Sequence, residues 1–120
     1  MGNPVMQFQI VTRAPDKLAA FYTSLFHWET NRDNFLGYQS VDTGSERGIS
    51  GGIWPAPPQA NGFVQLFIEV DDCAGYVERA VGLGARVIVP PQTLPDGDQM
   101  AILHDPEGIS FGIVKRSDAN

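Results

Sequence analysis

The sequence predicts an α+β fold in which two tandem βαβββ modules form a cup-shaped mixed sheet with the helices on the outside. Three observations lead to this prediction. A pattern of one strand, one helix and three short strands occurs twice, a proline-rich stretch separates the copies, and short sequence matches recur at a nearly constant offset. We therefore expect one domain over residues 1–120, with the first module at 5–54, a linker at 55–62 and the second module at 63–114.

The first module is predicted to begin with a strand at residues 6–12. Alternation in this strand places Phe8 and Ile10 on one face and Gln7 and Gln9 on the other. A helix ending near residue 26 or 27 follows, and its apolar side chains recur at i, i+3, i+4 and i+7: Leu18, Phe21, Tyr22 and Leu25. Three short strands are expected to complete the module, at residues 28–30, 38–42 and 49–54.

The prolines of residues 55–62 suit neither a helix nor a sheet, so this segment is interpreted as a stiff linker. A strand at residues 63–70 then restarts the pattern. We expect the module's own helix to cover the apolar face of this strand, which carries Leu66, Ile68 and Val70. The opposite face carries Gln65, Phe67 and Glu69.

The second helix is expected to start after Asp71 or Asp72, which would cap it, and to run to about Leu83, with Gly84 as its stop. Pro90-Pro91 is expected to end the strand that follows. The last three strands are predicted at residues 86–89, 99–103 and 109–114.

Internal sequence matches indicate that the two modules arose by duplication. Residues 47–53 resemble residues 107–113 at an offset of 60. Two further pairs are offset by 58: Gln7 with Gln65, and Leu25 with Leu83. Each match falls in the same predicted element of its module, which is the signature of an internal repeat.

Composition narrows the possible partners and the compartment. The net charge of −6 argues against nucleic acid or an anionic membrane as a partner, because phosphate binding needs a positive surface. A single cysteine allows no intrachain disulfide. Residues 1–6 lack the basic and apolar pattern of a secretory signal, and no apolar run approaches the length of a membrane span, so a cytoplasmic location is expected.

Several segments carry a resemblance to a known family. In the first half these are Gln7-Phe8-Gln9-Ile10, Phe21-Tyr22 and Leu25-Phe26-His27-Trp28. In the second half they are Phe67-Ile68-Glu69-Val70-Asp71-Asp72, Gly82-Leu83-Gly84-Ala85, Asp105-Pro106-Glu107-Gly108 and Phe111-Gly112-Ile113. Together they resemble the glyoxalase/bleomycin-resistance/dioxygenase group, or vicinal oxygen chelate superfamily. The resemblance implies the glyoxalase/bleomycin-resistance fold, and by analogy a homodimer.

Members of this superfamily usually hold a divalent metal at four positions, two in each module. The resemblance places these positions at Gln7, Gly52, Gln65 and Gly112. Glutamine amides are neutral ligands and glycine has no side chain, whereas a catalytic divalent site needs anionic or imidazole ligands. We therefore expect no metal cofactor.

Other residues could carry chemistry. Glu69 is a candidate general base, although a solvated carboxylate at the rim of the cup is an equal alternative. His27 is expected to lie at the surface by the end of the first helix, and His104 is expected to stabilise a turn, although it could instead face the mouth of the cup. Cys73 could have a lowered thiol pKa at a helix start, but a small buried residue is the more common role.

The residues expected to line a ligand pocket combine aromatic rings with amides and hydroxyls: Gln7, Gln9, Tyr38, Ser50, Trp54, Gln65, Phe67, Glu69 and Ser110. Tyr38 and Trp54 would stack on a flat ligand, and the polar groups would orient it. The leading hypothesis is a metal-free protein that holds a small apolar or aromatic molecule. The alternative is a metal-dependent lyase, isomerase or dioxygenase of the glyoxalase I type, similar to lactoylglutathione lyase.

Overall fold

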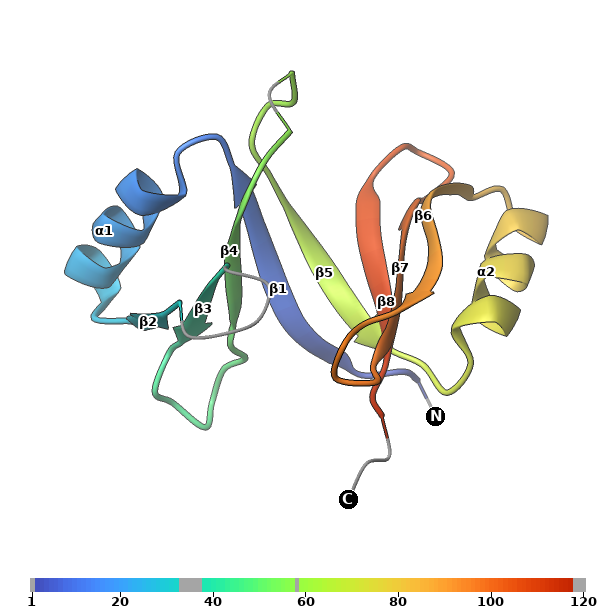
Figure 1. Cartoon of the computed structure of the whole chain (residues 1–120), viewed down its shortest axis with the longest axis horizontal. Helices are drawn as coiled ribbons and strands as arrows, with labels where there is room; N and C mark the ends of the chain where they lie inside the picture. The colour runs from blue at the N-terminus through green and yellow to red at the C-terminus, as the bar shows by residue number, and fades with distance from the viewer. Residues whose placement is uncertain (1, 33–37, 58, 118–120) are drawn as a thin grey trace. The chain divides into compact units, whose positions relative to one another are not determined.

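The computed structural model describes residues 2–32, 38–57 and 59–117 and divides into two compact units. The first unit is residues 7–65, and the second joins residues 1–6 to residues 66–120. Each unit has one helix packed on a β-sheet (Figure 1). Within the described part of the chain, neither helix has the length and apolar character needed to cross a bilayer.

The first unit follows the predicted order of strand, helix and three strands. Its elements are β1 (Val5–Thr12), α1 (Pro15–Phe26), β2 (Glu29–Asn31), β3 (Gln39–Asp42) and β4 (Gly51–Pro55). The strand order is β2-β3-β4-β1. β1 runs parallel to β4, and the other neighbouring strands are antiparallel.

The second unit repeats this arrangement. Its elements are β5 (Phe63–Glu69), α2 (Cys73–Gly82), β6 (Arg86–Thr93), β7 (Gln99–His104) and β8 (Ser110–Lys115). The start of β5, up to Gln65, belongs to the first unit, and the rest of the strand belongs to the second. The strand order is β5-β8-β7-β6, with β5 parallel to β8 and the other pairs antiparallel. Asp72 is the residue that caps α2, because its Oδ1 accepts a hydrogen bond from Gly75 N at 3.1 Å.

The strand registers confirm the tandem α+β architecture. Gln9 on β1 lies opposite Gly52 on β4, and Phe67 on β5 lies opposite Gly112 on β8. Equivalent residues of these two pairs differ by 58 in residue number on the first strand and by 60 on the last strand, which are the offsets of the sequence matches. The two modules are therefore copies of one unit in structure as well as in sequence.

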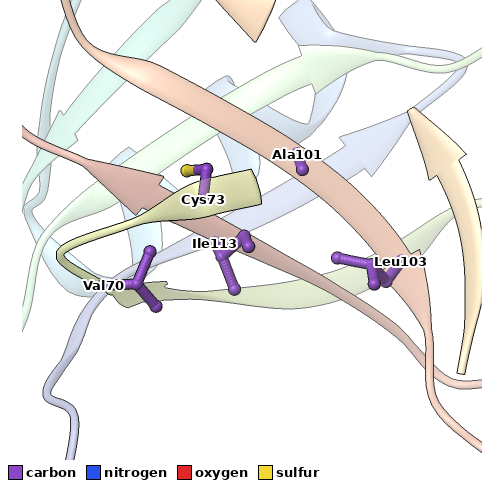
Figure 2. Packing of buried hydrophobic residues seen from close by; sticks show 5 residues of the cluster. All are labelled: Val70, Cys73, Ala101, Leu103 and Ile113. Atoms are coloured by element: carbon purple, nitrogen blue, oxygen red, sulfur yellow. The ribbon is translucent and has the colours of Figure 1, made fainter. Parts of the chain in front are cut away.

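Each unit has its own hydrophobic core. In the first, Ile10, Ala19, Val41 and Ile53 are buried, and Phe8, Leu18, Tyr22 and Trp28 pack around them. In the second, the core consists of Val70, Cys73, Ala101, Leu103 and Ile113. Figure 2 shows these five side chains drawn from the end of β5, the start of α2, and strands β7 and β8.

The expected break at Pro90-Pro91 is wrong, because β6 continues through both prolines to Thr93. β6 lies at the end of the strand order, where a residue without an N–H is tolerated. The pairing with β7 also shifts register between Val89 and Gln92, so the prolines fall at a bulge. In the same way, β4 includes Pro55, which was expected to start the linker. Pro58 of that predicted linker lies outside the described residues.

The apolar faces are less completely covered than the sequence pattern predicts. Phe21 and Leu25 of α1 are more than half exposed, and α1 buries Ala19 instead. α2 lies on β6, β7 and β8, which leaves Leu66 of β5 at 44% exposure. The expectation that α2 covers the apolar face of β5 is therefore wrong for Leu66, whereas Val70, just beyond the strand, does join the core.

Candidate functional site

One face of the first unit's sheet gathers several of the predicted pocket residues. Ile10 and Ile53 pack with Ala19 of α1, so the helix covers the face on which they lie. Successive strand residues alternate between faces, and residues paired across strands point the same way. Gln9 and its partner Gly52 therefore lie on the opposite face, together with Trp54 and Ser40. We call this the helix-free face of the first unit.

Gln9 and Gln65 form a buried amide pair. Gln65 Nε2 donates a hydrogen bond to Gln9 Oε1, and the two residues are 5% and 8% exposed, respectively. Such a bond offsets the cost of removing both amides from water. Gln9 Nε2 has no acceptor among the described residues. Thr43 Oγ1 is the one side-chain polar atom of the described residues that is both fully buried and without a hydrogen-bond partner. Gln9 Nε2 is therefore not completely shielded from solvent.

Tyr38 and Trp54 stack on each other directly above Gly52. Their ring centroids are 4.3 Å apart and their planes are 9° from parallel. A Cβ atom at Gly52 would lie 2.9 Å from Tyr38 Cε2 and 3.1 Å from Trp54 Nε1. Glycine is required here because the ring edges occupy the space of a side chain.

The corresponding position of the second unit is also covered by a ring. A Cβ atom at Gly112 would lie 2.5 Å from Cε2 of Phe67, whose side chain is 4% exposed. Phe67 is the β5 residue paired with Gly112, so in this module the covering ring comes from the neighbouring strand. In the first module the equivalent β1 residue is Gln9, and the covering ring comes from Tyr38 instead.

Glu69 is half-buried near the end of β5, on the same face as Phe67. Its backbone is fixed by the N-terminal segment: Glu69 N donates to Pro4 O at 3.0 Å, and Glu69 O accepts from Asn3 Nδ2 at 2.9 Å. Its carboxylate makes no hydrogen bond or ion pair with the described residues. A carboxylate in this state could accept a proton or a hydrogen bond from a ligand.

The remaining predicted pocket residues, Gln7, Ser50 and Ser110, lie on different strands and connections. Gln7 is half-buried and shares its strand face with Gln9. Ser50 is exposed and belongs to the β3–β4 connection, where its Oγ accepts from Thr43 N at 3.4 Å. Ser110 is half-buried and pairs with His104 at the end of the β7–β8 ladder.

The two histidines have simple surroundings. His27 is exposed and adopts a left-handed conformation with φ of 61°, and its N–H donates to Thr23 O at 3.0 Å to end α1. The turn after His104 is stabilised by Asp105 rather than by the histidine. Asp105 Oδ1 accepts from the backbone N–H groups of Glu107 and Ile109, both at 2.9 Å.

Cys73 is a buried core residue. It has no exposed surface, and it packs with Val70 and Ile113 (Figure 2). Burial raises the pKa of the Cys73 thiol, with a smaller contribution from the negative charge of Asp72. The thiol is therefore unreactive in the native state, as the structural role of a small buried residue predicts.

The four positions that the superfamily uses for metal provide weak donors in this chain. Gln65 already donates through Nε2 to Gln9, and Gly52 and Gly112 each lie beneath an aromatic ring. No cluster of three or more His, Cys, Asp or Glu side chains suited to a metal occurs among the residues that the structure describes.

The amide pair and the aromatic stack were not anticipated as contacts between site residues. The sequence pattern placed Gln9, Gln65, Tyr38 and Trp54 on a common lining, where each was expected to face a ligand. The structure joins them in two pairs instead. The alternation of side chains along each strand predicts which of these residues share a face, but it does not reveal which side chains contact each other.

Solved structures with the same fold cover nearly the whole chain. A hypothetical protein from Bacillus halodurans C-125 superposes with a TM-score of 0.73 at 12% identity, over 100% of this chain and 99% of that one. A methylmalonyl-CoA epimerase in complex with methylmalonyl-CoA and NH4+ gives 0.63 at 15% identity, over 98% and 97% of the two chains. The Mycobacterium tuberculosis methylmalonyl-CoA epimerase gives 0.64 at 11% identity, over 94% and 87%. At these identities the similarity establishes the fold.

Sequence comparison identifies the family. The chain is 26% identical over 110 residues to a protein of Mycobacterium bovis and Mycobacterium tuberculosis named "Putative glyoxylase CFP32". The match covers 89% of this chain and 42% of those proteins, so the chain spans less than half of their length. A family model described as a glyoxalase-like domain matches residues 7–114. The chain therefore belongs to the glyoxalase-like domain family.

Proposed function

We propose that this protein binds a small apolar or aromatic molecule without using a metal ion. The observation that carries the proposal is the presence of an aromatic ring over each of the two glycines at the superfamily's metal positions. These rings support a site that recognises its ligand by stacking and hydrogen bonding instead of by coordination.

The donor set at the four positions does not fit a divalent ion. A ligand side chain at Gly112 would collide with the buried ring of Phe67, and one at Gly52 would displace the Tyr38–Trp54 stack. The two remaining positions, Gln7 and Gln65, offer neutral amides. Neutral amides repay little of the free energy needed to remove water from such an ion.

The helix-free face of the first unit supplies what an aromatic ligand needs. Stacked rings provide a flat apolar surface, and an amide beside them provides directional hydrogen bonds. Sites for small molecules typically combine a mostly apolar lining with a few polar groups of this kind.

Metal analysis tests the metal-free proposal. The purified protein would be assayed for bound metals and then titrated with Ni²⁺, Zn²⁺, Fe²⁺ and Mn²⁺ by calorimetry, and we expect no stoichiometric binding. Tight one-to-one binding would contradict the proposal. In that case the matched variants Gln65→Ala and Gln59→Ala would show whether the ion uses a superfamily position or another site.

A second candidate function is an enzyme of the glyoxalase type with Glu69 as general base. The half-buried carboxylate of Glu69, which lacks a protein partner among the described residues, favours this candidate. The names of the relatives, a glyoxylase and methylmalonyl-CoA epimerases, point in the same direction. If a reaction is found, Glu69→Gln should abolish turnover while the exposed Glu78→Gln leaves it unchanged. Equal turnover in both variants would remove Glu69 from the mechanism.

A homodimer is part of the proposal by analogy with the superfamily. Light scattering after size exclusion tests it, with a mass of about twice 13.1 kDa expected for the eluting species. A monomer mass at micromolar concentration would contradict the dimer. The cytoplasmic location that the sequence indicates stays a prediction.

A further inference from the structure

We infer that the ligand binds on the helix-free face of the first unit alone, and that it is a planar molecule without negative charge that carries a hydrogen-bond acceptor such as a carbonyl oxygen or a ring nitrogen. This inference rests on the proposed small-molecule function and adds a location and a chemical class. It follows from a difference between the two modules, from two unpartnered donors, and from the charges of this face.

The two modules have diverged at one pair of equivalent positions. In the second module, Phe67 covers its partner Gly112 with a buried ring, so this part of the face is filled by the protein itself. In the first module the equivalent residue, Gln9, carries an amide that bonds to Gln65 instead of a ring that covers Gly52. The duplicated fold therefore offers a polar group to a ligand in one copy and a closed apolar contact in the other.

Two N–H donors of side chains on this face have no acceptors among the described residues. One is Nε2 of Gln9, which shares its oxygen, and not its N–H groups, with Gln65. The other is the indole Nε1 of Trp54, 3.1 Å from the position that a Cβ atom of Gly52 would take. Indole and amide N–H groups at a half-buried site usually find an acceptor, and a ligand oxygen or nitrogen would supply one.

The ligand is expected to carry no negative charge, because the charged side chains on this face are acidic. By strand register the face carries Gln7, Gln9, Val11, Asn31, Tyr38, Ser40 and Trp54, and also the carboxylates of Glu29 and Asp42. The cation Arg32 is paired with Asp16 of α1. A carboxylate ligand would lose hydration without gaining a counter-charge, whereas a carbonyl needs only the donors present.

Nuclear magnetic resonance tests the location directly. Coumarin is the planar probe with a carbonyl acceptor, naphthalene is the matched probe without one, and 2-naphthoate is the anionic probe. In ¹⁵N spectra we expect coumarin to shift the indole signal of Trp54 and one glutamine side-chain signal, identified by its loss in Gln9→Glu. The indole of Trp28, the other tryptophan, packs against Tyr22 and serves as the internal control that does not shift.

Affinities of variants test the donors. Gln9→Glu removes the amide N–H groups but keeps an acceptor for Gln65, and Trp54→Phe keeps a ring but removes the indole N–H. Each should weaken coumarin binding roughly threefold to tenfold, the value of one neutral hydrogen bond, and leave naphthalene binding unchanged. Ile102→Ala, at the β7 position paired with Gly112 in the second unit, should leave coumarin binding unchanged. Trp54→Phe keeps the test decisive if Gln9→Glu does not fold.

The outcomes separate the inference from the proposed function. Equal binding of coumarin and naphthalene, or loss of coumarin binding in Ile102→Ala alone, would overturn the inference and leave the small-molecule function standing. Preferred binding of 2-naphthoate would also overturn it. Failure of all three probes to bind at millimolar concentration would overturn the proposed function as well.

Discussion

A methyl group added at Gly112 provides a direct test of how the second unit is packed. In Gly112→Ala, the new Cβ would lie 2.5, 2.6 and 2.8 Å from Cε2, Cζ and Cδ2 of Phe67. The ring cannot swing away freely, because Phe67 is only 4% exposed. Either the ring or the β5–β8 pair must therefore move.

The expected magnitude combines two opposing effects. Overpacking a filled site costs about 1–3 kcal/mol. Replacing glycine with alanine returns about 0.4–1 kcal/mol by restricting the unfolded chain. The net expectation for Gly112→Ala is a loss of about 1–2 kcal/mol in the free energy of unfolding. Gly82→Ala is the matched control, because no heavy atom lies within 4 Å of its added Cβ in α2, and we expect it to stabilise the protein slightly.

Urea denaturation of the single and double variants measures this effect. In a Phe67→Leu background the ring is absent, so Gly112→Ala should cost about 1 kcal/mol less than it does in the native background. Unchanged slopes of the unfolding transitions would confirm that stability, and not the unfolded state, has changed. A Gly112→Ala variant as stable as the native protein, or an equal cost in both backgrounds, would refute the packing that we describe.

Three further predictions concern other parts of the second unit. Because the pKa of the Cys73 thiol is raised in the native state, its contribution to the free energy of unfolding is fully present below the ordinary thiol value of 9.0 and is lost as pH rises through the native pKa. In Cys73→Ala, the free energy of unfolding should no longer decrease with pH over this range. Asp105→Ala should lower the free energy of unfolding by about 1–2 kcal/mol, because two backbone N–H groups lose their acceptor, whereas Glu107→Ala in the same turn should have no measurable effect. Asn3→Ala removes hydrogen bonds to Glu69 O and Tyr76, and should speed amide exchange at the end of β5 without affecting β2.

The sequence was sufficient to predict the order of the elements and most of their positions. Because hydrophobic alternation and turn residues act locally, the strand that contains Gln7 and the helix that ends at Phe26 could be located from the pattern of nearby residues. The repeat then added long-range information. Offsets of 58 and 60 between matching segments are the offsets of the Gln9–Gly52 and Phe67–Gly112 pairs.

The contacts of the site could not be predicted in the same way. Whether Tyr38 stacks on Trp54 or stands apart from it depends on rotamers, and on the bare backbone of Gly52 between them. The Gln9–Gln65 bond joins residues 56 positions apart, so no local pattern reports it. The exposure of Phe21 was missed for a related reason: helical periodicity identifies an apolar stripe, but not how much of it the sheet covers.

The prolines of β6 have a consequence for the protein at high concentration. β6 ends the strand order of its sheet and exposes Val87 and Ile88, a combination that would invite another chain to add a strand. Consecutive N–H groups of a strand point to opposite sides, so one of the adjacent Pro90 and Pro91 removes a donor from this border, and the bulge around them bends it. A neighbouring molecule therefore cannot extend a continuous hydrogen-bonded ladder here, and these two residues keep the border from acting as a template for aggregation.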